Sequence, residues 1–309
     1  MNPMNPDFKN NIDTIVFHYP CQDGLSSAWV AYYYYKIKFP CKTLRLFPAQ
    51  HGKELIYDMV GENILFVDFC PSLDVIDLLR SKQNEIYILD HHITAKDSLS
   101  DCPFATFNMD KAGVGLTWEY FFQESDKPIP QFLAMIQERD LWKFRIEQTQ
   151  EFSNGLFFES ECLATFEEKF KLFEELYTNP EKVNKVIQLG TILNNHKQMK
   201  IASIVKKIKE NKYPCKDKFG NDVSIICYNC SADIASDLGN ALSSEHCDMA
   251  ILWTYDHLAE KYHYSLRSTN KVDCARLAKE YLSGGGHPNA AGGIHKVHPT
   301  EFVNNVLFK

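Results

Sequence analysis

Aspartate and histidine residues close three strand-like runs in the first half of this sequence, at positions where they could share metal ions. His18 ends the first of these runs, Asp68 ends a later one, and Asp90-His91-His92 ends the run after that. Sheets of parallel strands bind ligands in the crevice outside the carboxyl ends of their strands. We therefore expect these five side chains to meet in one crevice.

Two further aspartates could join this group. Asp23 lies in the turn Cys21-Gln22-Asp23-Gly24, which leads into a helix, and Asp140 follows a helix expected at 129–138. Several carboxylates in one cleft repel each other and therefore require cations. Oxygen and imidazole donors favour Mn²⁺ or Mg²⁺, and two metals held by a bridging carboxylate are a common device for phosphoester hydrolysis.

A simpler explanation is that each aspartate caps a helix, which is common after a strand. Helix capping explains any one of these positions. It does not explain Asp-His-His at one strand end together with His18 at another. The combination therefore favours a metal site.

The elements that must position these residues alternate between strands and helices. In the first half, strand-length apolar runs fall at 14–19, 43–47, 63–69 and 85–90, and helical patterns fall at 24–38 and 72–83. Such alternation predicts right-handed crossovers and a mainly parallel sheet. The run Tyr32–Tyr35 could form an aromatic platform, but its position in a helical pattern favours burial.

After Asp140 the pattern becomes helical, and a second α/β segment follows. Helices are expected at 166–177 and 181–211, a break at Pro214, strands at 223–227, 249–255 and 262–267, and helices at 234–243 and 273–282. We predict an α/β protein of two domains. The first covers residues 1–180, a helical connector covers 181–212, and a smaller α/β domain covers 213–309. The chain length agrees with two domains of roughly 100–200 residues.

Composition narrows the class further. The net charge of −7 argues against a protein that coats duplex DNA, although it allows a local basic site. The sequence contains no run of about 18 apolar residues, so we expect no membrane span, and the N-terminus lacks the pattern of a signal peptide.

Ten scattered cysteines fit reduced thiols, so we expect a cytoplasmic protein. We interpret Cys227 and Cys230 as strand-end residues rather than metal ligands, because no second pair lies at zinc-ribbon spacing.

The acidic and histidine motifs resemble those of the DHH phosphoesterase superfamily. The resemblance rests on Asp90-His91-His92 after an apolar strand, on Asp68 at the end of the strand before it, and on His18 with Asp23-Gly24. Residues 283–293 read SGGGHPNAAGG, which is similar to the glycine-rich signature of the associated DHHA1 domain. The superfamily includes RecJ-type exonucleases, nano-RNases (oligoribonuclease-like enzymes) and cyclic-dinucleotide phosphodiesterases.

The resemblance implies a role for each residue of the cluster. Asp68 would bridge two metal ions, by convention Mn²⁺, with Mg²⁺ or Co²⁺ as substitutes. Asp23, His91 and Asp140 would complete one metal site, and His18 would belong to the other. Asp90 would orient a histidine, and His92 would face the scissile phosphate.

Cys21 departs from the family pattern. In relatives with an Asp-x-Asp sequence at this point, the earlier aspartate binds the first metal, and Cys21 stands in its place. A cysteine could be a softer ligand, a residue that contacts a ligand, or no ligand. We expect Cys21 to lie within the site.

The second domain is expected to hold the substrate. Glycines let the backbone approach a ligand and donate N–H groups to phosphate, and an arginine offers a bidentate fork. A glycine-rich turn between a helix and the last strand is the simpler alternative. The candidate substrate-binding residues are Arg267, Ser268, Gly285, Gly286, His287 and Asn289, with Asn270 as a further polar loop residue.

A lysine-rich stretch lies between the two domains. Lysines occupy positions 197, 200, 206, 207, 209, 212, 216 and 218. A solvated helix face is the ordinary explanation, and an electrostatic guide for short nucleic acids is the alternative.

Together these features predict a divalent-metal-dependent phosphodiesterase or phosphatase that acts on short oligonucleotides or small phosphate-bearing nucleotides. An inorganic pyrophosphatase or polyphosphatase is the main alternative, although the glycine-rich segment counts against it. A non-catalytic nucleotide-binding module is a third hypothesis. No membrane partner is expected, and a homodimer is compatible with the sequence.

Overall fold

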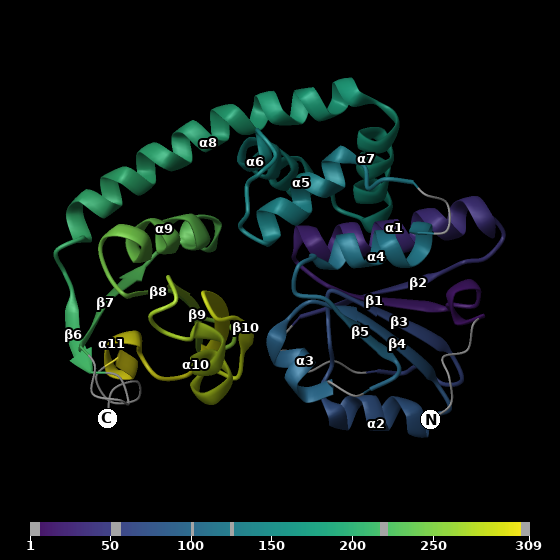
Figure 1. Ribbon diagram of the computed structural model, residues 1–309, viewed down its shortest axis with the longest axis horizontal. Coiled ribbons are helices and arrows are strands. Elements are labelled where there is room, and N and C mark those ends of the chain that lie inside the picture. Colours follow the sequence, from purple (N-terminus) through teal and green to yellow (C-terminus); the bar gives the residue numbers. More distant parts are fainter. Residues whose placement is uncertain (1–6, 51–56, 100–101, 124–126, 217–221, 304–309) are drawn as a thin grey trace. The chain divides into compact units, whose positions relative to one another are not determined.

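The structure is a computed structural model that describes residues 7–50, 57–99, 102–123, 127–216 and 222–303. The chain divides into two compact units, Met1–Asn194 and Asn195–Lys309, and each is described by itself (Figure 1). The division falls inside the helix α8 (Pro180–Ile208), a single element of 29 residues.

The first unit is built on a five-stranded parallel sheet. Its order is β2 (Arg45–Ala49), β1 (Thr14–His18), β3 (Asn63–Val67), β4 (Glu85–Asp90), β5 (Ala105–Phe107). The predicted parallel sheet is confirmed. The second predicted strand begins and ends two residues later than expected, and the short strand β5 was missed because three residues carry little pattern.

Alternating side chains of this sheet feed two separate cores. On one face Ile15 and Phe17 pack with α1 (Gln22–Lys38), α4 (Gly113–Phe122), α5 (Gln131–Asp140) and α7 (Phe166–Thr178). On the other face Val16 and Phe66 pack with α2 (Leu73–Ser81) and α3 (Ile93–Leu99) (Figure 1). The period of two along each strand produces this division.

Helix α1 is buried on nearly all sides, because it lies between the sheet and three other helices. Its residues 23–31 are buried, and so are Tyr34 and Tyr35. Tyr32 and Tyr33 are partly buried against the same core. The preference for a buried helix over an aromatic platform is therefore confirmed.

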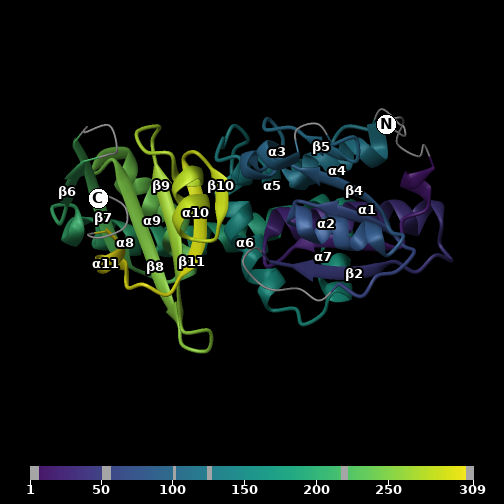
Figure 2. The same ribbon diagram turned by 90° about the horizontal axis from the view of Figure 1, so that it is seen from below.

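The second unit has a six-stranded mixed sheet. Its order is β10 (Gly285–His287), β11 (Ala290–His295), β9 (Lys261–Ser268), β8 (Met249–Asp256), β7 (Asp222–Asn229), β6 (Tyr213–Lys216). Within the described residues only β7 and β8 are parallel, and β8 and β9 form a hairpin that extends beyond the neighbouring strands (Figure 2). Helix α9 (Ala232–Glu245) packs with one core, while α10 (Cys274–Tyr281) and the short α11 (Pro299–Phe302) pack with the other.

The chain around Pro214 differs from the expected break. Residues Tyr213–Lys216 form β6, which pairs antiparallel with β7 at the edge of the sheet. An edge strand tolerates proline because one side of its backbone needs no partner strand. The break in helical pattern was correct, but the strand that follows it was missed.

The long helix α8 contributes residues to a hydrophobic core in each of the two units. Val186 and Ile187 near its start belong to the core of the first unit. Ile201 and Ile208 near its end pack with α9 in the second unit. Across the part of the chain that the structure describes, no helix combines the length and apolar character needed to cross a membrane.

Candidate metal centre

The carboxyl ends of β1, β3 and β4 lie side by side and carry the predicted cluster. Phe17 pairs with Val67, and Val67 pairs with Leu89, so the residues that follow them, His18, Asp68 and Asp90, are aligned across three strands. Asp68 adopts a left-handed backbone conformation with φ of +53°. This conformation is uncommon outside glycine but is tolerated by aspartate.

His91 gathers three aspartates around one ring nitrogen. Its Nε2 lies 3.1 Å from Asp68 Oδ1, 3.6 Å from Asp23 Oδ2 and 3.4 Å from Asp140 Oδ2. Asp140 is the last residue of α5, not a residue beyond the helix as expected. Asp23, His91 and Asp140 each offer one ligand atom within a mutual distance of 4.8 Å, which is suitable for a single metal ion.

A second group contains the unusual cysteine. His18 Nδ1 lies 3.4 Å from Asp68 Oδ2. The ligand atoms of His18, Cys21 and Asp68 all lie within 4.8 Å of one another. Cys21 therefore lies within the site, as expected from the sequence.

Asp68 offers a different oxygen to each group. Its Oδ1 is directed at His91 and its Oδ2 at His18. The side chain is 2% exposed, so both oxygens are removed from bulk water. This arrangement is the one expected of a carboxylate that bridges two cations.

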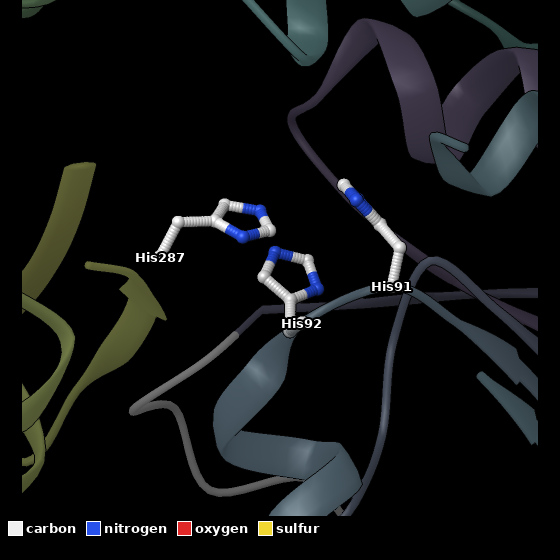
Figure 3. Close-up of side chains that lie close together, drawn as sticks. All are labelled: His91, His92 and His287. Atoms are coloured by element: carbon white, nitrogen blue, oxygen red, sulfur yellow. The ribbon is translucent and has the colours of Figure 1, made fainter. Parts of the chain in front are cut away.

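Asp90 orients the two histidines that follow it. Its Oδ1 accepts the backbone N–H of His91 at 2.7 Å and lies 2.7 Å from His92 Nδ1. Its Oδ2 is buried and has no hydrogen-bond partner among the described residues. The imidazoles of His91 and His92 project from adjacent residues directly after β4 (Figure 3).

The N-terminus of α4 is a part of the site that sequence reasoning missed. The carboxylate of Asp23 accepts the N–H groups of Gly113 at 2.6 Å and Val114 at 2.8 Å. A Cβ atom on Gly113 would lie 2.6 Å from Asp68 Cβ and 2.9 Å from Asp23 Oδ2. Only glycine permits α4 to begin this close to both aspartates, and the sole signal for this was a glycine at the start of an apolar helical run.

The electrostatics of the cluster reflect burial and crowding of charge. Burial and the neighbouring Asp68 raise the pKa of Asp23, although its two N–H donors stabilise the ionised carboxylate. Burial opposes the ionisation of Asp68 as well, but His18 and His91 hold its pKa well below the usual value. Burial and Asp68 also raise the pKa of the Cys21 thiol.

Burial acts on the pKa of the histidines in the opposite direction. Burial disfavours their charged forms, yet Asp140 and Asp68 raise the pKa of His91 to about 9, and Asp90 raises that of His92 to about 9. Buried carboxylates at this density draw any available cation. The donor set of carboxylates and imidazoles, together with the partnerless Asp90 Oδ2, fits divalent metal ions.

The candidate substrate-binding residues gather around β9, β10 and β11 of the second unit. Arg267 donates through Nη2 to Ser236 Oγ at 2.7 Å and pairs with Ala290 across the sheet. Ser268 is buried, and its hydroxyl donates to the carbonyl of Asp248 and accepts the N–H of Val272. That hydroxyl thus has a structural role.

The glycine-rich segment forms the β10–β11 hairpin at the edge of the second sheet. Gly285, Gly286 and His287 make up β10, and Gly286 has a φ of +141°. His287 is drawn in Figure 3. Asn289 lies in the turn and exchanges hydrogen bonds with Asn270, including Asn270 N–H to Asn289 Oδ1 at 2.8 Å.

The lysine-rich stretch is divided between the exposed surface of α8 and the residues that follow that helix. Lys200, Lys206 and Lys207 are exposed on α8, whereas Lys197 pairs with Asp237 of α9 at 3.0 Å. Lys218 lies outside the described residues. A guiding role for the exposed lysines stays a prediction.

The protein is thus a two-unit α/β protein with a candidate metal centre. The centre is a cluster of aspartates and histidines at the carboxyl edge of the parallel sheet, and a unit with a mixed sheet follows it in the chain. Residues 220–303 match the DHHA1 domain family. Uncharacterized protein R106 of Acanthamoeba polyphaga mimivirus is 34% identical over 323 residues, which cover 98% of this chain and 73% of that protein.

Solved structures share the fold at low sequence identity. The DHH domain of a member of a ribosomal protein family is 12% identical with a TM-score of 0.63, covering 96% of this chain and 86% of that chain. RecJ from Thermus thermophilus, solved with Mn²⁺, is 13% identical with a TM-score of 0.53, covering 95% of this chain and 50% of that chain. The second unit carries a DHHA1 domain, and the chain shares its fold with the solved DHH-domain structure, as the motifs predicted.

Proposed function

We propose that this protein is a divalent-metal-dependent phosphodiesterase or phosphatase that hydrolyses phosphoesters of short oligonucleotides or small nucleotides. The observation that carries the proposal is Asp68, which presents Oδ1 to His91 and Oδ2 to His18. A buried carboxylate with one oxygen in each of two ligand groups could hold two divalent ions, one through each oxygen's group. The proposed ions are Mn²⁺, as in the RecJ structure, with Mg²⁺ or Co²⁺ as substitutes.

When bound, such a metal pair activates water and neutralises the charge of phosphoryl oxygens. The protein's own residues position the reaction. Asp23, His91 and Asp140 hold one side of the site, and His18 with Cys21 holds the other. Asp68 is common to both sides and keeps the two groups at a defined separation.

His92 is the proposed catalytic residue of the protein itself. Asp90 accepts a hydrogen bond from His92 Nδ1, which leaves Nε2 as the ring atom that would donate to a phosphoryl oxygen. In the metal-free protein Asp90 raises the pKa of His92 to about 9, so the ring carries both protons at neutral pH. A protonated imidazole both stabilises developing negative charge and can release a proton to a leaving oxygen.

The DHHA1 unit is proposed to supply the contacts to the nucleotide. Arg267 and the backbone of the β10–β11 hairpin are suited to phosphate, because an arginine fork and glycine N–H groups are both common phosphate donors. The match of the second unit to the DHHA1 family supports this role.

The test is a hydrolysis panel with Mn²⁺ that contains di- to pentanucleotides, 3′,5′-bisphosphate nucleotides, cyclic dinucleotides and inorganic pyrophosphate. We expect turnover of one or more nucleotide substrates, and loss of that turnover in Asp68→Ala. Asp74→Ala, an exposed carboxylate in the first turn of α2, is the matched control and should retain turnover. Turnover that survives Asp68→Ala would contradict the mechanism, and turnover of pyrophosphate alone would replace the substrate class. Nucleotide affinity without turnover would instead indicate a binding module.

A further inference from the structure

Figure 1 shows the segment that joins α5 to α6 (Thr149–Glu161). It begins directly after the candidate metal ligand Asp140 and carries an aromatic cluster. The rings of Trp142 and Phe144 meet edge to face with centroids 5.1 Å apart. The guanidinium of Arg139 lies 4.2 Å from the centre of the Trp142 ring and 5.6 Å from that of Phe144. Both rings are partly exposed rather than buried in a core.

The backbone holds these rings in a costly conformation. Trp142 has a φ of +56° and Phe144 a φ of +49°, in the left-handed region that bulky residues rarely adopt. Buried Glu138 maintains the segment, because it accepts the N–H of Arg145 at 2.7 Å and the Arg145 guanidinium Nη2 at 2.6 Å. Strain of this kind persists only where surrounding contacts over-determine it, and it is concentrated at functional sites.

The cluster borders a hollow of about 310 Å³ that Trp142, Phe144 and Gln150 help to line. Gln150 Oε1 accepts a hydrogen bond from Arg139 Nη1 at 3.2 Å, which assigns the other amide atom as Nε2. That Nε2 is buried and has no hydrogen-bond partner among the described residues. A buried amide donor without an acceptor carries a desolvation cost that a ligand acceptor would relieve.

The geometry points to a nucleobase-binding subsite formed by Trp142, Phe144 and Gln150, which would hold one base of the substrate while its phosphate lies at the metal centre. This inference rests on the proposed function and specifies its substrate class. Partly exposed aromatic rings accept any base through its π-face, and the Gln150 amide would donate to an acceptor on the base edge. Glu147 and Glu151 also line the hollow, so it disfavours a phosphate and favours an uncharged base.

The connectivity of the chain supports a base in the hollow and a phosphate at the metal centre. Asp140 and Trp142 are two residues apart, so their Cα atoms lie within about 7.6 Å of each other. Asp140 turns its carboxylate to His91, while Arg139 before it turns its guanidinium to the aromatic rings. One short segment thus contributes to both the metal centre and the hollow. A nucleotide, in which a single sugar joins base and phosphate, is of a size to reach both.

The test compares the dinucleotide ApA with its counterpart in which abasic riboses replace both adenosines. With Mn²⁺, the wild-type protein should show a kcat/KM for ApA about tenfold or more above that for the abasic diester. Trp142→Leu should reduce this ratio to near one, mainly by raising KM for ApA. Gln150→Leu should reduce it partially.

Phe158→Leu is the control, because Phe158 is an equally aromatic residue that is 48% exposed on α6 and does not line the hollow. It should retain the wild-type ratio. A wild-type ratio of one, or a ratio in Trp142→Leu equal to that of the wild type, would overturn the subsite while leaving the phosphoesterase proposal intact.

Equilibrium binding of ApA, measured by calorimetry, separates the two proposals. If no phosphodiester is hydrolysed, the proposed function fails, but ApA affinity that falls about tenfold in Trp142→Leu and not in Phe158→Leu still supports the subsite. Equal ApA affinity in the wild type and in a correctly folded Trp142→Leu protein, as judged by circular dichroism, overturns it.

Discussion

Asp90 Oδ1 lies 2.7 Å from His92 Nδ1 and at the same distance from the backbone nitrogen of His91, so one buried oxygen orients both histidines of the Asp-His-His sequence. Two residues of this motif are therefore placed by the third. The motif combines a side chain directed at the aspartates of the cluster, His91, with His92, the side chain proposed to contact the substrate. Because Asp90 holds the backbone of His91 and the ring of His92, the two side chains can have different roles.

Asp90→Asn should lower kcat by about 10- to 100-fold, because loss of an outer carboxylate partner removes the orientation and basicity of the histidine that it holds. The amide cannot stabilise the imidazolium, so the pKa of His92 should fall from about 9. The alkaline limb of the kcat profile should then shift to lower pH. Metal content is measured alongside, because a variant that has simply lost metal would show a lower maximum without that shift.

Mn²⁺ affinity should rise with pH from about 6 to about 9. In the metal-free protein the pKa of His91 is raised to about 9, so its ring carries both protons at neutral pH and must lose one when metal binds. Raising the pH toward the pKa of His91 removes the competing proton and strengthens binding. Calorimetric titrations in buffers of different ionisation enthalpy measure the protons released, and release of none at about pH 7 would contradict this account.

Cys21→Asp should strengthen Mn²⁺ binding relative to Co²⁺ or Cd²⁺, because a carboxylate replaces a thiolate that prefers softer metals. In the wild type, Co²⁺ should give a sulfur-to-cobalt charge-transfer band in the near ultraviolet. Cys21→Ser should lose that band while it still binds Co²⁺ through the remaining donors. A Co²⁺-loaded wild type without the band would show that Cys21 approaches the metals without binding them.

Gly113→Ala should weaken Mn²⁺ binding by about tenfold or more, because ligands displaced from their positions hold a metal less tightly. Its Cβ would lie 2.6 Å from Asp68 Cβ, so α4 must move away from two metal ligands at once. Overpacking of this kind also costs about 1–3 kcal/mol of the free energy of unfolding. The matched control is Gly239→Ala in the second unit, where the new Cβ would lie 2.7 Å from Arg267 Cγ. It should lower stability similarly without changing Mn²⁺ affinity, and equal metal affinity in both variants would contradict the role of Gly113.

Much of the metal centre follows from local sequence pattern. Short unbroken apolar runs define the strands, and the polar residue after each run, such as His18 or Asp68, must then lie at the carboxyl edge of a parallel sheet. Burial of α1 was predictable for the same reason, because its apolar spacing marks a packed helix. These features depend on residues close together in the chain.

Other features depend on contacts between residues far apart, which local pattern does not encode. Gly113 is 90 residues from Asp23, and no periodicity relates the start of α4 to that carboxylate. Pro214 ends a helical pattern, but only pairing with β7 at a sheet edge makes its neighbours a strand. The strained backbone at Trp142 and Phe144 exists because Glu138 and Arg145 hold it.

The sequence by itself determined the kind of chemistry available to this protein, since residue types and their positions at strand ends select metal ions and phosphoesters. The tertiary structure decided how that chemistry is arranged. It assigned separate oxygens of Asp68 to two ligand groups, brought Cys21 into one of them, and placed an aromatic hollow beside Asp140. The physical reason is that ligand geometry is set by side-chain direction and packing across the fold, whereas donor type is a property of each residue alone.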